Sequence, residues 1–260
     1  MAEEFIKFLG TAGARFVMAR QLRYSAGTLV AIGGQKLMLD PGPGTLLRCA
    51  KSRPPIDPCS LDAIVLTHGH IDHSGDVNAL LDAMTWGGFK PRGRLFAPEE
   101  CLEGERAVVL KYLREYLDEV VVLKPESRYA AGPLEFATSR RHLHPAETYG
   151  VKFSQGRRAV AFLVDTRYFD GLIDAYRDAD VLIINVVRRT PHESDAVMHL
   201  TLDDARNIID AVRPRKAVLT HLGMTMLKAR PRDVARSLSE ELGVDVIAAS
   251  DGMTLRLDED

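Results

Sequence analysis

The sequence predicts a layered α/β fold, and three observations support this prediction. Short runs of β-branched and other apolar residues recur through both halves of the chain, and amphipathic helical segments separate them. Several runs are apolar at every position, which indicates strands buried on both faces. At 260 residues, with 46% of them apolar, the chain is long enough to bury a sizeable core.

The expected strands and helices follow one another along the whole sequence. Strands are expected at residues 5–9, 28–32, 36–39, 63–66, 134–137, 159–164, 181–187, 217–219 and 244–248. Helices are expected at residues 76–84, 105–117, 169–177, 202–212 and 232–242. Thr201 is placed to cap the fourth helix, with Asp204 three residues on, and Pro231 lies near the first turn of the fifth.

Composition narrows the class of protein. No repeat, low-complexity linker or composition break divides the chain, so we expect residues 1–260 to form a single domain. A formal net charge of -2 gives no global attraction to nucleic acid or to membranes. No apolar run approaches the roughly 18 residues of a membrane span, and the N-terminus is acidic where a signal peptide would be basic. Cys49, Cys59 and Cys101 are widely spaced, which suits a reducing compartment. We therefore expect a soluble, cytoplasmic protein.

One short segment concentrates metal-binding residue types. His68, His70, Asp72 and His73 lie within six residues, directly after an apolar strand. A strand ending in a tight loop can direct the first two side chains at one ion and the last two at a second. Imidazole together with carboxylate suits Zn²⁺, with Mn²⁺ or Fe²⁺ as alternatives, rather than Ca²⁺ or Mg²⁺. This density of ligand types predicts a metal site.

Two metals need further ligands, and residues of the right type follow later strands. Asp165 comes directly after the run 159–164, and His221 comes just after the run 217–219. An isolated Asp or His after a strand is more often a helix cap or a turn residue. The repetition of one arrangement favours the metal-ligand interpretation for both.

A further histidine ligand is expected near Pro145. His142 and His144 lie two residues apart, which would place them on the same face of an extended segment. We choose His144, at the loop end beside Pro145, although the sequence allows the two roles to be exchanged.

Two other residues have supporting or catalytic roles in this scheme. Asp40 follows an apolar strand and precedes Pro-Gly, so we expect it to orient a ligand histidine without binding metal, although a turn-forming Asp explains it almost as well. His199, just before Thr201, is a candidate for protonating a leaving oxygen or for stabilising transition-state charge. Asp72 and His199 are the candidate catalytic residues.

These residues, in this order, resemble the metallo-β-lactamase superfamily, whose HxHxDH motif is matched at positions 68 to 73. The resemblance extends over most of the chain, from Phe8-Leu9-Gly10-Thr11 to Leu219-Thr220-His221. It implies an αββα four-layer sandwich with a dinuclear metal site at one edge. Carried over position by position, it places His68, His70 and His144 on one metal, Asp72, His73 and His221 on the other, and Asp165 on both.

Within the superfamily, the chain looks most like the branch of RNase Z and the phosphoribosyl cyclic phosphodiesterases. Phe8-Leu9-Gly10-Thr11, the spacing of His144 and Gly150, and the segment His199-Leu200-Thr201 resemble that branch. Only 20 residues separate His144 from Asp165, too few for the long arm with which RNase Z grips tRNA. A small phosphate-containing substrate is therefore expected rather than nucleic acid. The branch often forms homodimers, so we expect a homodimer.

The expected activity is that of a metal-dependent hydrolase, a phosphodiesterase. Two divalent ions about 3.5 to 4 Å apart can share a water and lower its pKa, which gives a metal-bound hydroxide beside the substrate. The same chemistry serves phosphodiesters, cyclic phosphates, thioesters and lactones. The alternatives are therefore thioester or lactone hydrolysis at the same site, or a non-catalytic member of the fold that binds metal or nucleic acid.

Overall fold

The computed structural model describes residues 3–25, 27–156 and 158–257, and in this part of the chain the strands form two mixed sheets. The first sheet has the order β14 (Thr254–Arg256), β1 (Phe5–Phe8), β2 (Thr28–Ile32), β3 (Gln35–Leu39), β4 (Ala63–Val65), β5 (Arg94–Pro98) and β6 (Glu119–Leu123). The second has the order β13 (Asp245–Ala248), β12 (Lys216–Thr220), β11 (Val181–Asn185), β10 (Arg158–Leu163), β9 (Tyr149–Gln155), β8 (Leu134–Arg141) and β7 (Arg128–Ala131).

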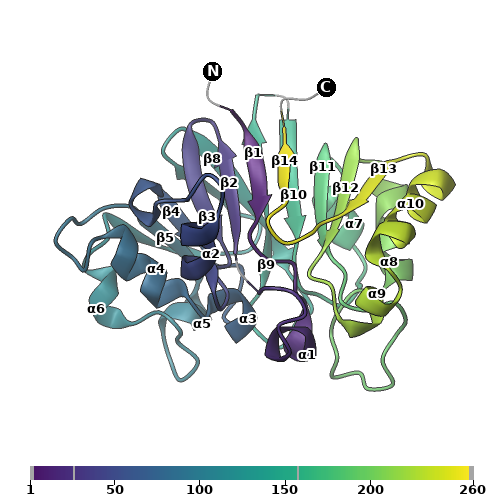
Figure 1. Cartoon of the computed structure of the whole chain (residues 1–260), viewed down its shortest axis with the longest axis horizontal. Coiled ribbons are helices and arrows are strands. Elements are labelled where there is room, and N and C mark those ends of the chain that lie inside the picture. Colours follow the sequence, from purple (N-terminus) through teal and green to yellow (C-terminus); the bar gives the residue numbers. More distant parts are fainter. Residues whose placement is uncertain (1–2, 26, 157, 258–260) are drawn as a thin grey trace.

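Helices cover the outer faces of the two sheets (Figure 1). The first sheet carries α2 (Thr45–Lys51), η1 (Pro58–Ser60), α3 (Ile71–Ser74), α4 (Val77–Met84), α5 (Glu99–Leu102) and α6 (Lys111–Arg114). The second carries α7 (Leu172–Tyr176), α8 (Leu202–Val212), α9 (Met224–Lys228) and α10 (Pro231–Leu242), while α1 (Ala14–Ala19) lies at the lower edge in the figure. The predicted αββα sandwich is confirmed.

Burial of the strands on both faces explains their continuous apolar character. In β11, Val181 and Ile183 pack in the core between the two sheets. Leu182 and Ile184, the alternate residues, pack in the cluster that the helices of the second sheet complete. Because successive side chains of a strand point to opposite faces, a strand in a middle layer must be apolar at every position.

Parallel pairing brings the ends of distant strands to one edge. Strands β3 to β6 pair parallel to one another, and so do strands β10 to β13. The residues that follow these strands emerge at the lower edge in Figure 1, where α1 and α3 also lie. Polar residues at this edge lie outside the apolar core. Ligand-binding and active sites of parallel sheets usually lie at this edge.

The predicted helix ends at Thr201 and Pro231 are confirmed. The Thr201 hydroxyl accepts a hydrogen bond from the Asp204 N–H at 3.2 Å, and the Asp204 carboxylate accepts one from the Thr201 N–H at 2.9 Å. This reciprocal pair satisfies two N–H groups that a helix start leaves without a partner. Pro231 is the first residue of α10, where its missing N–H costs nothing.

The helix expected at residues 105–117 is wrong, because only Lys111–Arg114 is helical. The Asn78 side chain donates to the Val108 carbonyl at 2.8 Å and accepts from the Leu110 N–H at 2.9 Å. These backbone groups therefore bond to α4 and cannot contribute to a continuous helix through residue 110. In the described part of the chain, no helix is long and apolar enough to cross a membrane.

Candidate metal centre

The histidine-rich segment forms a loop and one helical turn after β4. Asp40, which follows β3, fastens the start of this loop: its carboxylate oxygens accept hydrogen bonds from the Thr67 N–H at 2.7 Å and the Thr67 hydroxyl at 2.6 Å. At the other end, the Ser74 hydroxyl donates to the carbonyl oxygens of Gly69 and His70 at 3.1 and 3.0 Å. The loop backbone is therefore held at both ends.

Three imidazoles form a first cluster of ligand atoms. His68, His70 and His144 each offer a nitrogen, and these nitrogens lie within 4.8 Å of one another. His144 Nε2 is 2.9 Å from His70 Nδ1. The other nitrogen of His144, Nδ1, is 3.2 Å from the Met198 carbonyl oxygen. The contact with a backbone carbonyl favours the proton on Nδ1 and leaves the Nε2 lone pair facing the cluster.

The structure separates the two histidines that the sequence left as alternatives. His142 points away from the cluster, with Nδ1 3.2 Å from the Asp165 carbonyl oxygen and Nε2 2.8 Å from the Tyr176 hydroxyl. Burial lowers the pKa of His142 to about 4, so this side chain is neutral at pH 7. The expectation that His142 and His144 share a face is wrong, because the chain turns here and the His144 N–H donates to the His142 carbonyl at 3.1 Å.

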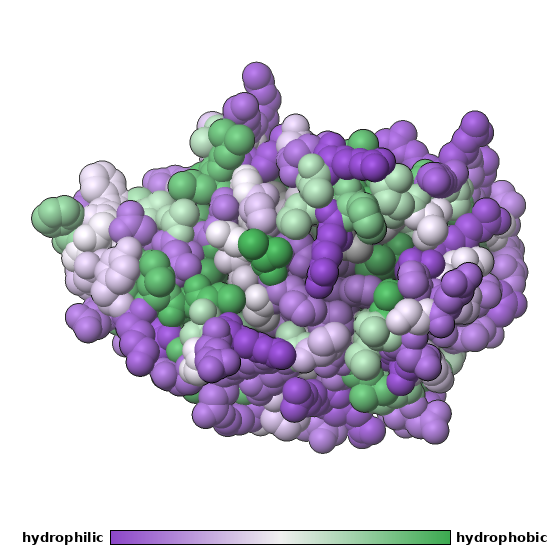
Figure 2. Space-filling view, turned by 90° about the horizontal axis from the view of Figure 1, so that it is seen from below, coloured by the Kyte–Doolittle hydropathy of each residue, from purple (hydrophilic) through white to green (hydrophobic). Residues whose placement is uncertain are grey.

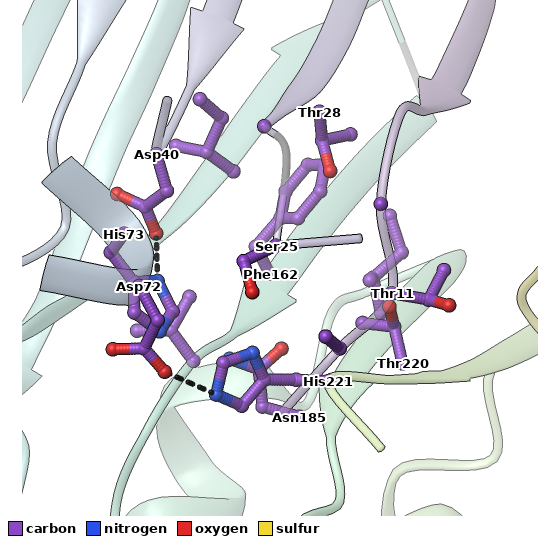
Figure 3. Close-up of a pocket in the computed structure, with 16 residues that line it drawn as sticks. Thr11, Ser25, Thr28, Asp40, Asp72, His73, Phe162, Asn185, Thr220 and His221 are labelled. Atoms are coloured by element: carbon purple, nitrogen blue, oxygen red, sulfur yellow. Dashed lines mark hydrogen bonds and ion pairs between the residues drawn. The ribbon is translucent and has the colours of Figure 1, made fainter. Parts of the chain in front are cut away.

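A second cluster combines Asp72, His73 and His221, whose ligand atoms also lie within 4.8 Å of one another (Figure 3). His221 Nε2 is 3.7 Å from an Asp72 carboxylate oxygen. His73 Nδ1 is 3.0 Å from Asp40 Oδ2, so Nε2 is the nitrogen left to face the cluster. The structure thus places Asp40 where a carboxylate that orients a ligand histidine would lie.

Asp165 lies between the two clusters. Its Oδ2 is 4.0 Å from His68 Nε2 and 3.9 Å from His144 Nε2, in the first cluster. The same oxygen is 3.6 Å from His73 Nε2, and Oδ1 is 3.4 Å from His221 Nε2, in the second. One buried carboxylate therefore faces both groups of imidazoles.

Asn185 is a site residue that sequence reasoning missed. Its Nδ2 donates a hydrogen bond to Asp165 Oδ1 at 2.9 Å, and the contact is buried. Asn185 is the last residue of β11, which lies between β10 and β12, the strands that precede Asp165 and His221. The signal was available, since Asn185 is a polar residue at a strand end, but an amide is not a usual ligand type.

His199 lies at the same site, as the sequence predicted. Its Nδ1 is 3.6 Å from Asp165 Oδ2, and His144, Asp165 and His199 form a further group of ligand atoms within 4.8 Å. The capping box at Thr201, two residues on, anchors the backbone that carries this histidine. Burial lowers the pKa of His199, and the nearby Asp165 carboxylate opposes that shift.

The buried groups of the site shift one another's pKa values. Burial, then the neighbouring His73, lowers the pKa of His68 well below its ordinary value. Burial alone would raise the pKa of Asp165, but His221 and His199 outweigh it and hold this pKa well below the usual range. For His73, burial would lower the pKa, but Asp72, Asp165 and Asp40 outweigh it and raise the pKa.

Unpaired imidazole nitrogens test whether the site fits metal ions. Among the described residues, hydrogen-bond partners are lacking for four buried nitrogens of the site: His68 Nε2, His73 Nε2, His199 Nδ1 and His221 Nε2. Buried polar atoms without partners are rare and costly unless they serve another purpose. Imidazole and carboxylate donors at this density are the ligands that Zn²⁺ and similar ions take, so the donor set fits.

Close backbone packing positions the ligands. A Cβ added to Gly13 would lie 2.0 Å from the His221 carbonyl oxygen, and one added to Gly42 would lie 2.0 Å from the Asp72 carbonyl oxygen. Asp40 and His221 themselves have φ values of 48° and 54°, which non-glycine residues seldom adopt. The backbone at Gly13 and Gly42 therefore packs directly against the backbone of two candidate ligands, and two candidate site residues have strained backbone conformations.

Residues 35–222 match the beta-lactamase superfamily domain, and the chain belongs to that superfamily. The predicted family resemblance is thereby confirmed. The match includes the segments that carry both clusters, from the turn after β3 to His221.

Three relatives are similar over most of their own length. The uncharacterized protein MJ1374 of Methanocaldococcus jannaschii is 28% identical over 97% of this chain and 94% of its own. The probable metallo-hydrolase YhfI of Bacillus subtilis is 26% identical over 76% of this chain and 80% of its own. A ribonuclease Z of Methanopyrus kandleri is 25% identical, and 98% of each chain is covered.

Solved structures share the fold. YhfI of Bacillus subtilis superposes with a TM-score of 0.79 at 20% identity, covering 98% of this chain and all of that one. A diphosphatase from the PhnP family superposes with a TM-score of 0.71 at 23% identity, covering 98% of each chain. At these identities the likeness shows the fold alone.

Proposed function

We propose that this chain is a metal-dependent hydrolase that cleaves phosphodiester or cyclic phosphate bonds in a small molecule. The position of Asp165 carries the proposal. This buried carboxylate lies between two clusters of imidazole and carboxylate ligands, and the clusters hold buried nitrogens with no hydrogen-bond partner among the described residues. Two neighbouring cation sites that share one carboxylate account for this arrangement.

In this proposal, seven residues bind the metal ions and three others support them or act on the substrate. His68, His70 and His144 would hold one ion, Asp72, His73 and His221 the second, and Asp165 both. Bound there, two ions, which we propose to be Zn²⁺, would supply Lewis acidity and a water of lowered pKa. Asp40 fixes the orientation of the His73 ring through Nδ1, and Asn185 fixes the carboxylate of Asp165. His199 lines the open side of the site, where its imidazole can give a proton to a leaving oxygen.

The choice of a phosphoryl substrate rests on the relatives and on the charge of the site entrance. A ribonuclease Z that matches almost the whole chain has a name that states action on a phosphodiester polymer. Arg15 and Arg188 line the pocket that opens from the clusters, where guanidinium groups favour phosphate oxygens. β9 and β10 take up most of the segment between His144 and Asp165, so this segment supplies no arm for holding an RNA.

Metal content and hydrolysis together test the proposal. We expect about two Zn²⁺ per chain after reconstitution and turnover of bis-p-nitrophenyl phosphate. Asp165→Ala should lose metal and reduce turnover by a hundredfold or more, on the order of what removing one key polar group costs. Asp170→Ala is the matched control, because Asp170 is exposed and lies only five residues further on.

Three results would contradict the proposal. The first is a chain that binds no metal after reconstitution. The second is activity that is indifferent to Asp165→Ala. The third is faster turnover of a fluorogenic thioester or lactone than of the phosphodiester, which would indicate the acyl hydrolase that the same site could support.

A further inference from the structure

The candidate metal centre opens into a pocket of about 510 Å³ whose walls are apolar. Phe16 of α1 and Ile71 of α3 contribute to the walls, although 70% and 65% of their surfaces remain exposed. Val197 and Met198, from the loop before α8, also line the pocket. Figure 2 shows hydrophobic residues on both sides of a central hydrophilic strip on this end of the molecule. Large apolar side chains left exposed beside a polar cluster mark a surface that a ligand covers.

Two arginines add positive charge to the same pocket. Arg15 belongs to α1, and Arg188 follows β11 on another part of the lining. In residues 3–25, 27–156 and 158–257, neither guanidinium is within ion-pair distance of a carboxylate, and the hydrogen bond of Arg188 is to the Thr190 carbonyl at 3.1 Å. The backbone of Arg188 is fixed by a bridge to Thr201. A guanidinium group whose backbone is held in place, and whose other N–H groups can still donate hydrogen bonds, is suited to bind a carboxylate or a phosphate.

The pocket is larger than the reacting group needs. His70, His144 and Asp165 form the floor of the pocket, the part that would face a reacting phosphoryl group. A volume of about 510 Å³ is in the range of sites that take whole small molecules. The rest of the ligand must therefore match apolar walls and two positive charges at once.

We infer that the substrate is a small phosphoryl compound that also carries an apolar group and a second anionic group. This inference rests on the proposed function. The apolar group lies against Phe16, Ile71 and Met198, and the second anion is held by Arg188 with Arg15 nearby.

A series of three phosphonates tests the inference by binding alone, because none of them contains a phosphate ester bond to hydrolyse. Methylphosphonate probes the floor, phenylphosphonate adds the ring, and 4-phosphonobenzoate adds a distal carboxylate. Calorimetric titration of the zinc-loaded protein should show an affinity gain of about tenfold for the ring, the value of a well-buried aromatic group. The carboxylate should add about threefold to tenfold at low salt and less at 1 M salt, where screening is strong.

Paired variants assign each gain to its residue. Phe16→Ala should remove most of the gain from the ring, whereas Phe89→Ala should not, because Phe89 is exposed and lies outside this pocket. Arg188→Gln should remove the gain from the carboxylate, whereas Arg189→Gln, at the exposed neighbouring position, should not. Unchanged methylphosphonate binding in Phe16→Ala, Phe89→Ala and Arg189→Gln shows that the site itself is intact in these variants, and a retained gain from the ring shows the same for Arg188→Gln.

The possible failures are distinguishable. A protein that hydrolyses bis-p-nitrophenyl phosphate but binds the three phosphonates equally overturns the inference and leaves the proposed function standing. Gains that persist in Phe16→Ala and Arg188→Gln overturn it as well. A protein that hydrolyses no phosphodiester and binds no phosphonate overturns both.

Discussion

Removal of Asn185 tests how far the position of Asp165 depends on one hydrogen bond. The Nδ2 of Asn185 donates to Asp165 Oδ1 at 2.9 Å, and both side chains are buried. A hydrogen bond to a charged group contributes about 1.5 to 3 kcal/mol, which corresponds to a factor of roughly 10 to 150 in an equilibrium constant. Bound cations would also restrain the carboxylate, so the lower half of this range applies. Asn185→Ala should therefore weaken zinc binding about 10- to 50-fold.

The assay is competition for zinc against a chelator of known affinity, together with a kcat and KM measurement on a phosphodiester. Asn207→Ala is the matched control, since Asn207 lies on the exposed face of α8. Asn185→Asp keeps the size of the side chain but replaces the Nδ2 donor with a second carboxyl group against Asp165, and the hydrogen bond is lost when both carboxyl groups are ionised. Zinc affinity in Asn185→Ala within twofold of that of the unaltered chain would show that Asp165 keeps its position without Asn185.

Three other changes probe the parts that support the site. Thr201→Ala removes the capping box of α8 and should lower the free energy of unfolding, measured by urea titration, by about 0.5 to 2 kcal/mol. An equal loss of stability in the control Asn207→Ala, at an exposed position of the same helix, would show that the effect does not come from the cap. Gly13→Ala places a Cβ 2.0 Å from the His221 carbonyl oxygen, so it should destabilise the fold by about 1 to 3 kcal/mol and weaken zinc binding. Unchanged stability and unchanged zinc affinity would show that the backbone can move apart at this contact. Burial would raise the pKa of Glu100, but the Glu147 N–H and Arg106 outweigh burial and lower this pKa. Ionised Glu100 therefore stabilises the fold above its unfolded pKa of about 4.3. This stability is lost as the pH falls through the lower pKa of the folded state. Glu100→Gln should therefore destabilise the protein at pH 7 but little at pH 3, and a difference independent of pH would contradict the assignment.

Much of the fold was predictable because burial on both faces leaves a direct trace in the sequence. Four of the five residues of β11 are apolar, and α8 has the bounds that its cap and periodicity predicted. The helix expected at residues 105–117 failed because the Asn78 side chain, distant in sequence, takes up the backbone groups of Val108 and Leu110. A periodic pattern cannot reveal such a competitor.

The positions of site residues were predictable where a histidine or aspartate follows a parallel strand, as at His68, Asp165 and His221. His144 could not be chosen from alternation alone, because β8 carries a register shift between Thr138 and Arg141 and the chain turns again before His144. The number and identity of the ions bound by these residues stay predictions.

Anomalous diffraction from crystals of the zinc-loaded chain would locate the bound ions and count them. We expect two zinc peaks, one among His68, His70 and His144 and one among Asp72, His73 and His221, with the Asp165 carboxylate between them. A single peak, or none after zinc loading, would contradict a dinuclear centre, and a peak held by His199 in place of His144 would contradict the division of ligands.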